Sequence, residues 1–137
     1  MIANNWCTRD PILTPLNRVS FVGSDLSKAN FTGLNITQAC FDNAIMHSTI
    51  CSDAQFEKAS FVDANMQECQ LRGAKLERCN FRGANLMEGS LAKANIVGAD
   101  FEGANLFAVD FLRSTQGETN FAHANLDVTL IKDWRPA

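Results

Sequence analysis

Large apolar residues recur at every fifth position through most of this sequence. Between Phe21 and Ile131, 22 of the 23 residues at this spacing are apolar if Cys51 is counted, and Gln116 is the exception. On a helix, a step of five rotates each side chain by about 140°, so these residues would ring the helix and form no apolar stripe. On a strand, an odd step alternates between the two faces. The spacing therefore predicts neither a helix nor a continuous strand.

A second pattern precedes each of these large residues, which we call central residues. The residue two positions before is Ala in 12 of 23 cases, and the residue one position before is Asn or Asp in 12 of 23. A coil with short straight sides satisfies both patterns, because each five-residue side then points one large and one small residue inward before a turn. Asn and Asp suit the strained backbone near such turns, since their side chains bond locally and tolerate unusual dihedrals. Four sides converging on a narrow interior predict a coil of 20 residues.

An interval of 20 residues is visible in the sequence independently of the interval of five. Six central residues spaced by 20 are all Phe, and the next side carries Leu or Met at every coil. A column of aromatic residues at one interval indicates a stack of rings, one for each coil. We therefore expect an all-β solenoid of about five and a half coils over residues 19–131. The six aromatic positions are Phe21, Phe41, Phe61, Phe81, Phe101 and Phe121.

Units such as ANFTG at 29–33, ANLME at 84–88 and ADFEG at 99–103 resemble the A(D/N)LxX unit of pentapeptide repeat proteins. The resemblance covers about residues 19–131 and implies a right-handed quadrilateral β-helix. The segments IMHSTIC at 45–51 and RSTQGET at 113–119 depart from the unit without gaining or losing a residue. We expect residues 1–18 and the tail at 132–137 to cover the open ends of the helix. The alternative is a homodimer through a terminal coil.

Composition narrows the class of protein. The chain has 137 residues, of which 46% are hydrophobic and 20% charged, with a formal charge of −3. These values favour one folded domain and do not suggest direct nucleic-acid or membrane binding. No apolar run approaches the ~18 residues of a membrane span, and the N-terminus lacks the apolar core of a signal peptide. Together with five cysteines that form no C-x-x-C pair, this predicts a cytoplasmic protein.

The sequence contains no pattern that indicates catalysis. It has no glycine-rich phosphate loop and no H-E-x-x-H motif. His47 and His123 fall on different sides and about four coils apart, too far to share a metal. Three cysteines, at 51, 69 and 79, fall at inward positions, whereas Cys40 points outward. We therefore expect no enzyme activity, no cofactor and no metal.

Outward apolar residues suggest a binding surface for a protein partner. Met87 and Phe107 share one outward position on consecutive coils and should stack about 4.8 Å apart. The polar stretch 113–119 should bulge outward beside them, with Gln116 at least partly exposed, because buried amides need several hydrogen-bond partners. The alternative is that the C-terminal tail covers this surface. The predicted site consists of Met87, Phe107, Leu112, Arg113, Gln116 and Val128 on a non-enzymatic scaffold, such as an accessory or effector-associated domain.

Acidic residues on two neighbouring sides provide an alternative function. The family resemblance implies it, because quinolone-resistance members are thought to mimic duplex DNA and to occupy the DNA site of gyrase. Duplex DNA would present on the order of 15 charges over a rod of about 26 Å, whereas these two sides carry a net charge of six. A mildly acidic solvated surface is the simpler interpretation. The residues of the alternative, an inhibitor or protector of a type II topoisomerase, are Asp42, Asp63, Glu68, Glu88, Asp100 and Glu102.

Overall fold

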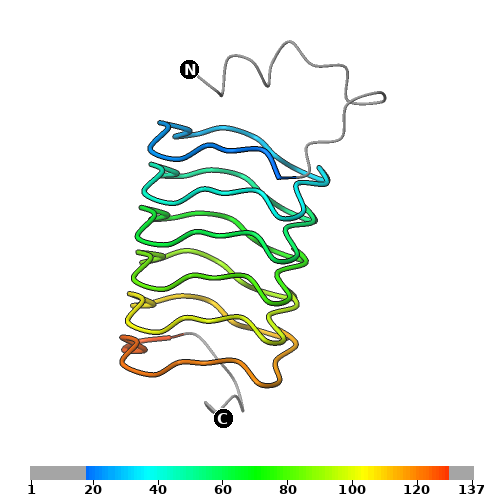
Figure 1. Cartoon of the computed structure of the whole chain (residues 1–137). Helices are drawn as coiled ribbons and strands as arrows, with labels where there is room; N and C mark the ends of the chain where they lie inside the picture. Colours follow the sequence, from blue (N-terminus) through cyan, green and yellow to red (C-terminus); the bar gives the residue numbers. More distant parts are fainter. Residues whose placement is uncertain (1–17, 130–137) are drawn as a thin grey trace.

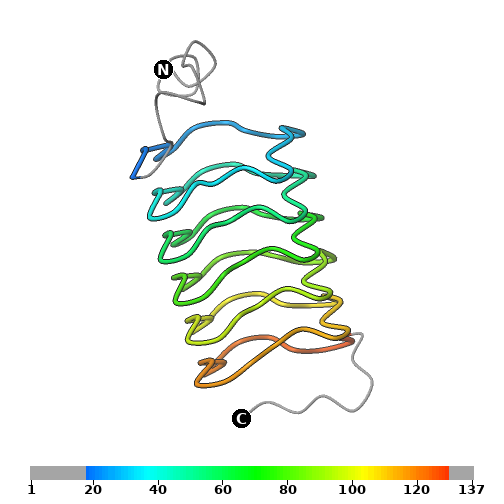
Figure 2. The same ribbon diagram turned by 90° about the vertical axis from the view of Figure 1, so that its right-hand side faces the viewer.

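The computed structural model describes residues 18–129, which form a rod of stacked four-sided coils (Figures 1 and 2). Its regular structure consists of isolated parallel β-bridges between residues 20 apart, from Ser20 with Cys40 to Asn105 with Asn125. Within residues 18–129 there is no helix and no strand longer than a single bridge. The 20-residue interval predicted from the sequence is therefore the interval of the bridges.

Each coil has four sides of five residues, and we number the sides in chain order. The first sides are 19–23 and the segments that follow every 20 residues, and the second, third and fourth sides begin at 24, 29 and 34. In every side, an inward residue, which is small everywhere except at Leu34, is followed by a bridge residue, a central residue and two turn residues. Neighbouring coils therefore place equivalent residues directly beside one another, in columns along the rod.

Backbone hydrogen bonds account for nearly every N–H group of this unit. The N–H of Phe61 donates to the carbonyl of Asn80 at 2.7 Å, and that of Asp63 to the carbonyl of Arg82 at 3.0 Å. The N–H of Ala64 closes the turn onto the carbonyl of Phe61 at 3.1 Å. Bridge residues donate back to the preceding coil. Only the N–H of the first turn residue lacks a backbone acceptor, and a hydrogen bond to this group adds to stability.

Bridge-residue side chains supply the missing acceptor. The Oδ1 atom of Asn95 accepts the N–H of Val97 at 3.1 Å, and equivalent bonds occur at most turns. This confirms that Asn and Asp bond locally. The unusual backbone falls elsewhere, on the second turn residue, where φ is 61° at Glu88 and 70° at Gly98. The expectation that Asn and Asp before the central residue carry the strained dihedrals is wrong, because there they serve as hydrogen-bond acceptors.

The Phe column forms the predicted ladder in the interior. Consecutive ring centroids from Phe21 to Phe121 lie 4.7–5.5 Å apart, with planes within 13° of parallel. This spacing is close to the ~4.8 Å between β-strands, and it makes the ladder about 25 Å long. Phe31, Phe56 and Phe111 pack edge-on against the ladder. The central residues from Phe21 to Phe111 are all buried, so the rod has one continuous core.

The predicted end covers, at 1–18 and 132–137, lie almost wholly outside the described residues and stay predictions. Ile131 also lies outside them. Within residues 18–129, no helix is long and apolar enough to cross a bilayer.

Candidate interaction surface

Met87 and Phe107 occupy the first turn position of the second side in consecutive coils. The Asn85–Asn105 bridge joins these coils, and the two asparagines accept the N–H groups of Met87 (3.2 Å) and Phe107 (3.1 Å). Both apolar side chains are half-buried. Val128, at the second turn position one coil further on, is 65% exposed. Three residues of the predicted site therefore lie along one corner of the rod.

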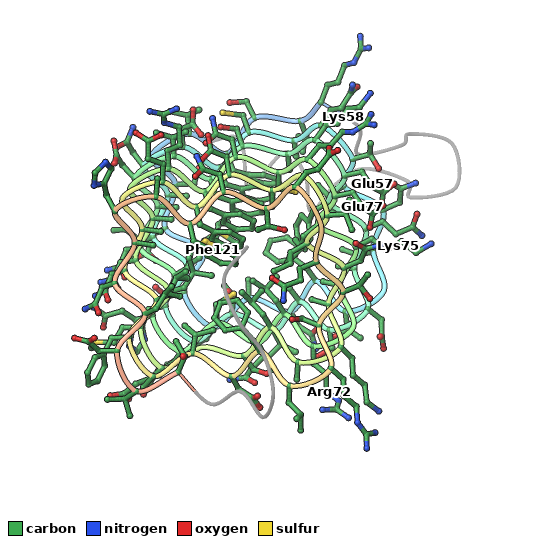
Figure 3. The ribbon with its side chains drawn as sticks, turned by 90° about the horizontal axis from the view of Figure 1, so that it is seen from below. Glu57, Lys58, Arg72, Lys75, Glu77 and Phe121 are labelled. Carbon is green, nitrogen blue, oxygen red and sulfur yellow. The ribbon has the colours of Figure 1, made fainter. Side chains whose placement is uncertain are left out.

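Leu112 and Arg113 lie at the next corner, which closes the third side. Leu112 shares a column with Arg72, whose label marks that corner in Figure 3. Leu112 is exposed, while Ala92, between these two residues in the column, is buried. The predicted site is thus divided between two corners and does not form one patch.

Gln116 does not lie on a bulge, so this part of the prediction is wrong, whereas the expected partial exposure of the residue is confirmed. The Asn95–Thr115 bridge is intact, and the N–H of Gly98 donates to the carbonyl of Gly117 at 2.8 Å. The Oε1 atom of Gln116 is buried and has no hydrogen-bond partner among the described residues, although the residue as a whole is half-buried. The β-bridge hydrogen bonds between neighbouring coils join backbone groups only. They therefore hold this side in place whatever central side chain it carries.

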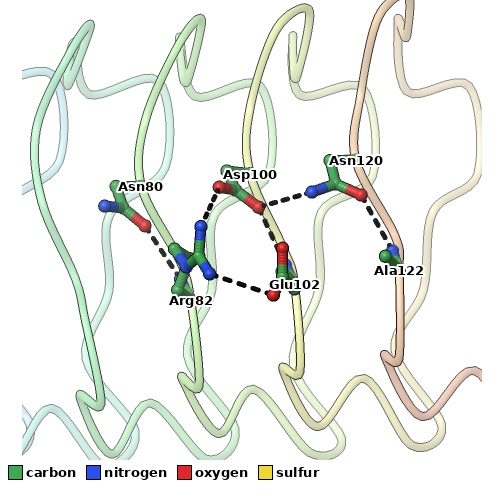
Figure 4. A network of polar contacts seen from close by, with 6 residues as sticks. All are labelled: Asn80, Arg82, Asp100, Glu102, Asn120 and Ala122. Atoms are coloured by element: carbon green, nitrogen blue, oxygen red, sulfur yellow. Dashed lines mark hydrogen bonds and ion pairs between the residues drawn. The ribbon is translucent and has the colours of Figure 1, made fainter.

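On the first side, one arginine forms ion pairs with two of the four carboxylates (Figure 4). Arg82 forms ion pairs with Asp100 at 3.4 Å and with Glu102 at 2.9 Å. Asp100 also accepts the side-chain N–H of Asn120 at 3.0 Å and the backbone N–H of Glu102 at 3.0 Å. A surface that mimics DNA needs uncompensated charge, and this network removes part of it.

Two further acidic residues of the alternative site, Asp42 and Glu68, also accept hydrogen bonds from neighbouring side chains or backbone. Asp42 accepts hydrogen bonds from the hydroxyl of Ser60 and from the N–H of Val62. Glu68 accepts the hydroxyl of Ser48 at 3.1 Å and contacts the imidazole of His47 at 3.4 Å. Among the described residues, Asp63 and Glu88 are the two of the six without a side-chain hydrogen bond or ion pair.

The contact of Ser48, His47 and Glu68 is the arrangement here that most resembles a catalytic one. In a catalytic triad, the imidazole stands between the hydroxyl and the carboxylate. Here Ser48 Oγ lies 3.1 Å from Nδ1 of His47 and donates to Oε2 of Glu68, which the imidazole also contacts. The imidazole contacts the hydroxyl through Nδ1 and the carboxylate through Nε2, but the hydroxyl donates directly to the carboxylate, which a catalytic triad does not allow. The region 18–129 also contains no group of three or more metal-ligating side chains.

The four described cysteines fit the predicted division into inward and outward positions. Cys51, Cys69 and Cys79 are buried, and Cys40 is partly exposed. Burial raises the pKa of Cys79 and of Cys40, and the hydrogen bond with Cys69 together with burial raises the pKa of Cys51. Because the thiolate is the reactive form, these three groups have low reactivity at neutral pH.

A shallow groove of about 290 Å³ lies at the corner between the fourth and first sides (Figure 3). Glu57 and Glu77 each bury an Oε1 atom that has no partner among the described residues. Lys58 and Arg78 also line the groove, together with Val97. The two carboxylates and two cations balance, so the groove has no net charge with which to select a ligand.

The sequence interpretation did not pick out Ile45 and Ile50. Both occupy the bridge position, where the other described sides carry Asn, Asp or another non-aliphatic residue, and they are 43% and 41% exposed. The signal was present in the sequence, because an apolar residue stands in the Asn/Asp position twice within IMHSTIC.

Comparison with known proteins finds a matching family model and solved structures of similar fold. Residues 16–47, 49–87 and 84–114 match the family model described as pentapeptide repeats, in 8 copies. No curated protein is similar to the chain at a significant level. Full-length QnrB1, a plasmid-mediated fluoroquinolone resistance protein, is 22% identical with a TM-score of 0.54, over 86% of this chain and 75% of that chain.

A trypsin-treated QnrB1 variant is 19% identical with a TM-score of 0.50, over 82% of this chain, which spans only 60% of the QnrB1 chain. Rfr23 from the cyanobacterium Cyanothece 51142 is 20% identical over 97% of both chains, with a TM-score of 0.37. At these identities the QnrB1 structures show a shared fold and nothing about activity.

Proposed function

Because this chain belongs to the pentapeptide repeat family, we propose that it is a non-enzymatic scaffold that binds a protein partner. The observation that supports this is the row of Met87, Phe107 and Val128 along one corner of the rod. Solenoids of this kind present extended rigid surfaces, because each coil is fixed by its neighbours. Met and aromatic residues are also enriched where proteins meet.

Phe107 is the expected anchor of this site. Its backbone is fixed by the hydrogen bond to Asn105, and its ring is half-buried beside the Met87 coil. A partly exposed aromatic side chain on a rigid backbone loses little conformational freedom on binding, which favours affinity. Leu112, Arg113 and Gln116 belong to the neighbouring corner and side, so they would contribute only to a partner that reaches around the third side.

The Phe107→Asp variant tests the proposal. It should abolish capture of a partner from the native cell while the β-type circular dichroism stays unchanged. Val22→Asp is the matched control, since Val22 is 51% exposed at the same turn position of the first side. Equal capture by both variants would contradict the proposal, and unfolding of Phe107→Asp would identify the residue as part of the core.

A second candidate is an inhibitor or protector of a type II topoisomerase that acts through the acidic sides. Its support is the fold shared with QnrB1, together with the open carboxylates of Asp63 and Glu88. The ion pairs of Arg82 weaken this candidate. A gyrase supercoiling assay with and without a fluoroquinolone tests it, and the Asp63→Asn/Glu88→Gln variant should reduce any effect. No effect of the parent chain would remove this candidate.

The finer architecture is part of the same proposal. We propose a right-handed course of about five and a half coils over residues 19–131, with residues 1–18 and 132–137 covering the ends. Bridges that run from Ser20 to Asn125 support the coil number. Deleting residues 1–17 should then expose the first coil and cause end-to-end association in sedimentation velocity. A monomeric deletion variant would argue against the cover.

A further inference from the structure

Two successive sides of the second coil break the local rule of this fold. One coil earlier, at the same positions, Asp25 accepts the N–H of Ser27 at 3.0 Å and Asn30 accepts that of Thr32 at 2.9 Å. Ile45 and Ile50 stand at the equivalent positions and offer no acceptor. The side chains that would complete these two turns are therefore replaced by aliphatic ones.

The N–H groups of His47 and Ser52 are the donors affected. Neither has a hydrogen-bond acceptor among residues 18–129, although both belong to regular turns of the ladder. Leaving a donor without its protein partner weakens the folded state. The N–H groups of Glu57, Arg72 and Glu77 also lack an acceptor within this range, but their bridge residues are polar. The exposed aliphatic residues at 45 and 50 are therefore the feature that needs a reason other than local stability.

Burial of the two isoleucines does not supply that reason. Their side chains remain 43% and 41% exposed, and neither belongs to the buried core. The other exposed large apolar residues, Val22, Leu112 and Val128, occupy turn positions, where no side-chain acceptor is needed. Places where a sequence breaks its own local rule without a structural gain are expected at functional sites.

The two isoleucines flank a corner that is held rigid. His47 and Ser48 form the turn between them, and both contact the carboxylate of Glu68 from the next coil, at 3.4 and 3.1 Å. Bridges to the coils on both sides fix the backbone of Ile45 and of Ile50. The result is a pair of aliphatic side chains presented on either side of one fixed corner.

Charge around this corner indicates the chemistry of a partner. The neighbouring outward positions on this coil and the two adjoining ones carry five carboxylates and two cationic groups, Asp25, Asp42, Asp53, Asp63, Glu68, Lys28 and Arg72. An apolar contact surrounded by net negative charge is complementary to an apolar segment that also carries cationic side chains.

We propose that Ile45 and Ile50 are the anchors of a docking site for a protein segment in which apolar residues alternate with lysine or arginine. The isoleucines supply the apolar contact, and the surrounding carboxylates select the cationic side chains. The site lies on the same corner as Met87, two coils or about 10 Å away, but uses different residues. It does not depend on the function proposed for Met87 and Phe107.

The test uses a double variant that should keep or raise thermal stability while it lowers the affinity for a peptide. Ile45→Asn/Ile50→Asn restores both side-chain acceptors, so its melting temperature should equal or exceed that of the parent chain. Its affinity for a fluorescein-labelled peptide of alternating leucine and lysine should fall about ten-fold or more, measured by anisotropy. Val22→Asn removes a similarly exposed apolar residue on the first side and should leave the affinity unchanged.

Several results would overturn the proposal. These are unchanged peptide affinity in the double variant, absence of saturable binding by the parent chain, and equal binding of a matched leucine–glutamate peptide. A lower melting temperature of the double variant would assign the isoleucines a structural role. A parent dimer that becomes monomeric in the double variant would identify the occupant as a second copy. Phe107→Asp should not affect peptide binding, which separates this site from the one proposed above.

Discussion

Replacing Asn95 by Ala tests how the side-chain acceptors stabilise the coil. Asn95 lies in the middle of the rod, and its Oδ1 atom accepts the half-buried N–H of Val97 at 3.1 Å. Alanine removes this acceptor and leaves the bridge to Lys75 in place, because that bridge uses backbone groups only. The free energy of unfolding should fall by about 1 kcal/mol, the typical net value of one such hydrogen bond.

The chain offers matched controls for this experiment. Gln55 occupies the bridge position of the same side two coils earlier, and no hydrogen bond from the N–H of Glu57 to its side chain occurs. Gln55→Ala should therefore cost little. Asn95→Asp keeps an acceptor oxygen and should retain most of the stability of the parent chain.

Urea unfolding followed by circular dichroism measures all three variants, with the slope against denaturant compared to detect any change in cooperativity. If Asn95→Ala and Gln55→Ala lose the same stability, or if Asn95→Asp loses as much as Asn95→Ala, the acceptor role is refuted. The preference for Asn and Asp would then reflect backbone conformation alone.

Substitutions at other positions should lower stability in some cases and raise it in others, and one thiol should show a pH-dependent reaction rate. Phe81→Ala, at the centre of the ladder, should cost about 3–5 kcal/mol in urea unfolding, and Phe121→Ala, at its more open end, clearly less. Gln116→Leu should raise stability by about 1–2 kcal/mol, because it removes a buried oxygen without a partner. Ala108→Gly should add about 1 kcal/mol by relieving a φ of 57°. Iodoacetamide should alkylate Cys40 more slowly than a free thiol at pH 8 and faster as pH rises, because burial raises its pKa.

The sequence was sufficient to predict the interior of the rod. Inward positions accept only residues that fit a narrow apolar space, so the five- and 20-residue intervals are visible in the sequence and the Phe ladder follows from them. The bulge at Gln116 was predicted because a buried amide is unfavourable. That estimate left out the backbone bonds on both sides of the residue, which keep the coil regular.

The outward surface was harder to predict. The sequence interpretation assigned Leu112 to the same binding surface as Phe107 while placing it around the next corner, and the turns keep the two residues at different corners. Sorting residues by side hid the ion pair of Arg82 with Glu102, which joins residues 20 apart in one column. Exposed positions face water and accept many residue types, so their pattern carries little information about geometry. Comparing residues at intervals of 20 would have found this ion pair.

The placement of the bonds between coils also determines how this rod should respond to mechanical tension. Apart from the turn closures, the ladder bonds join residues 19 to 21 apart, so each coil is held only by its immediate neighbours. A force applied between the two ends should therefore peel coils off one at a time. Each released coil lengthens from about 5 Å to as much as ~70 Å, since 20 residues extend by at most ~3.3–3.6 Å each. Stretched in this way, the protein would act as a tether that lengthens in equal steps.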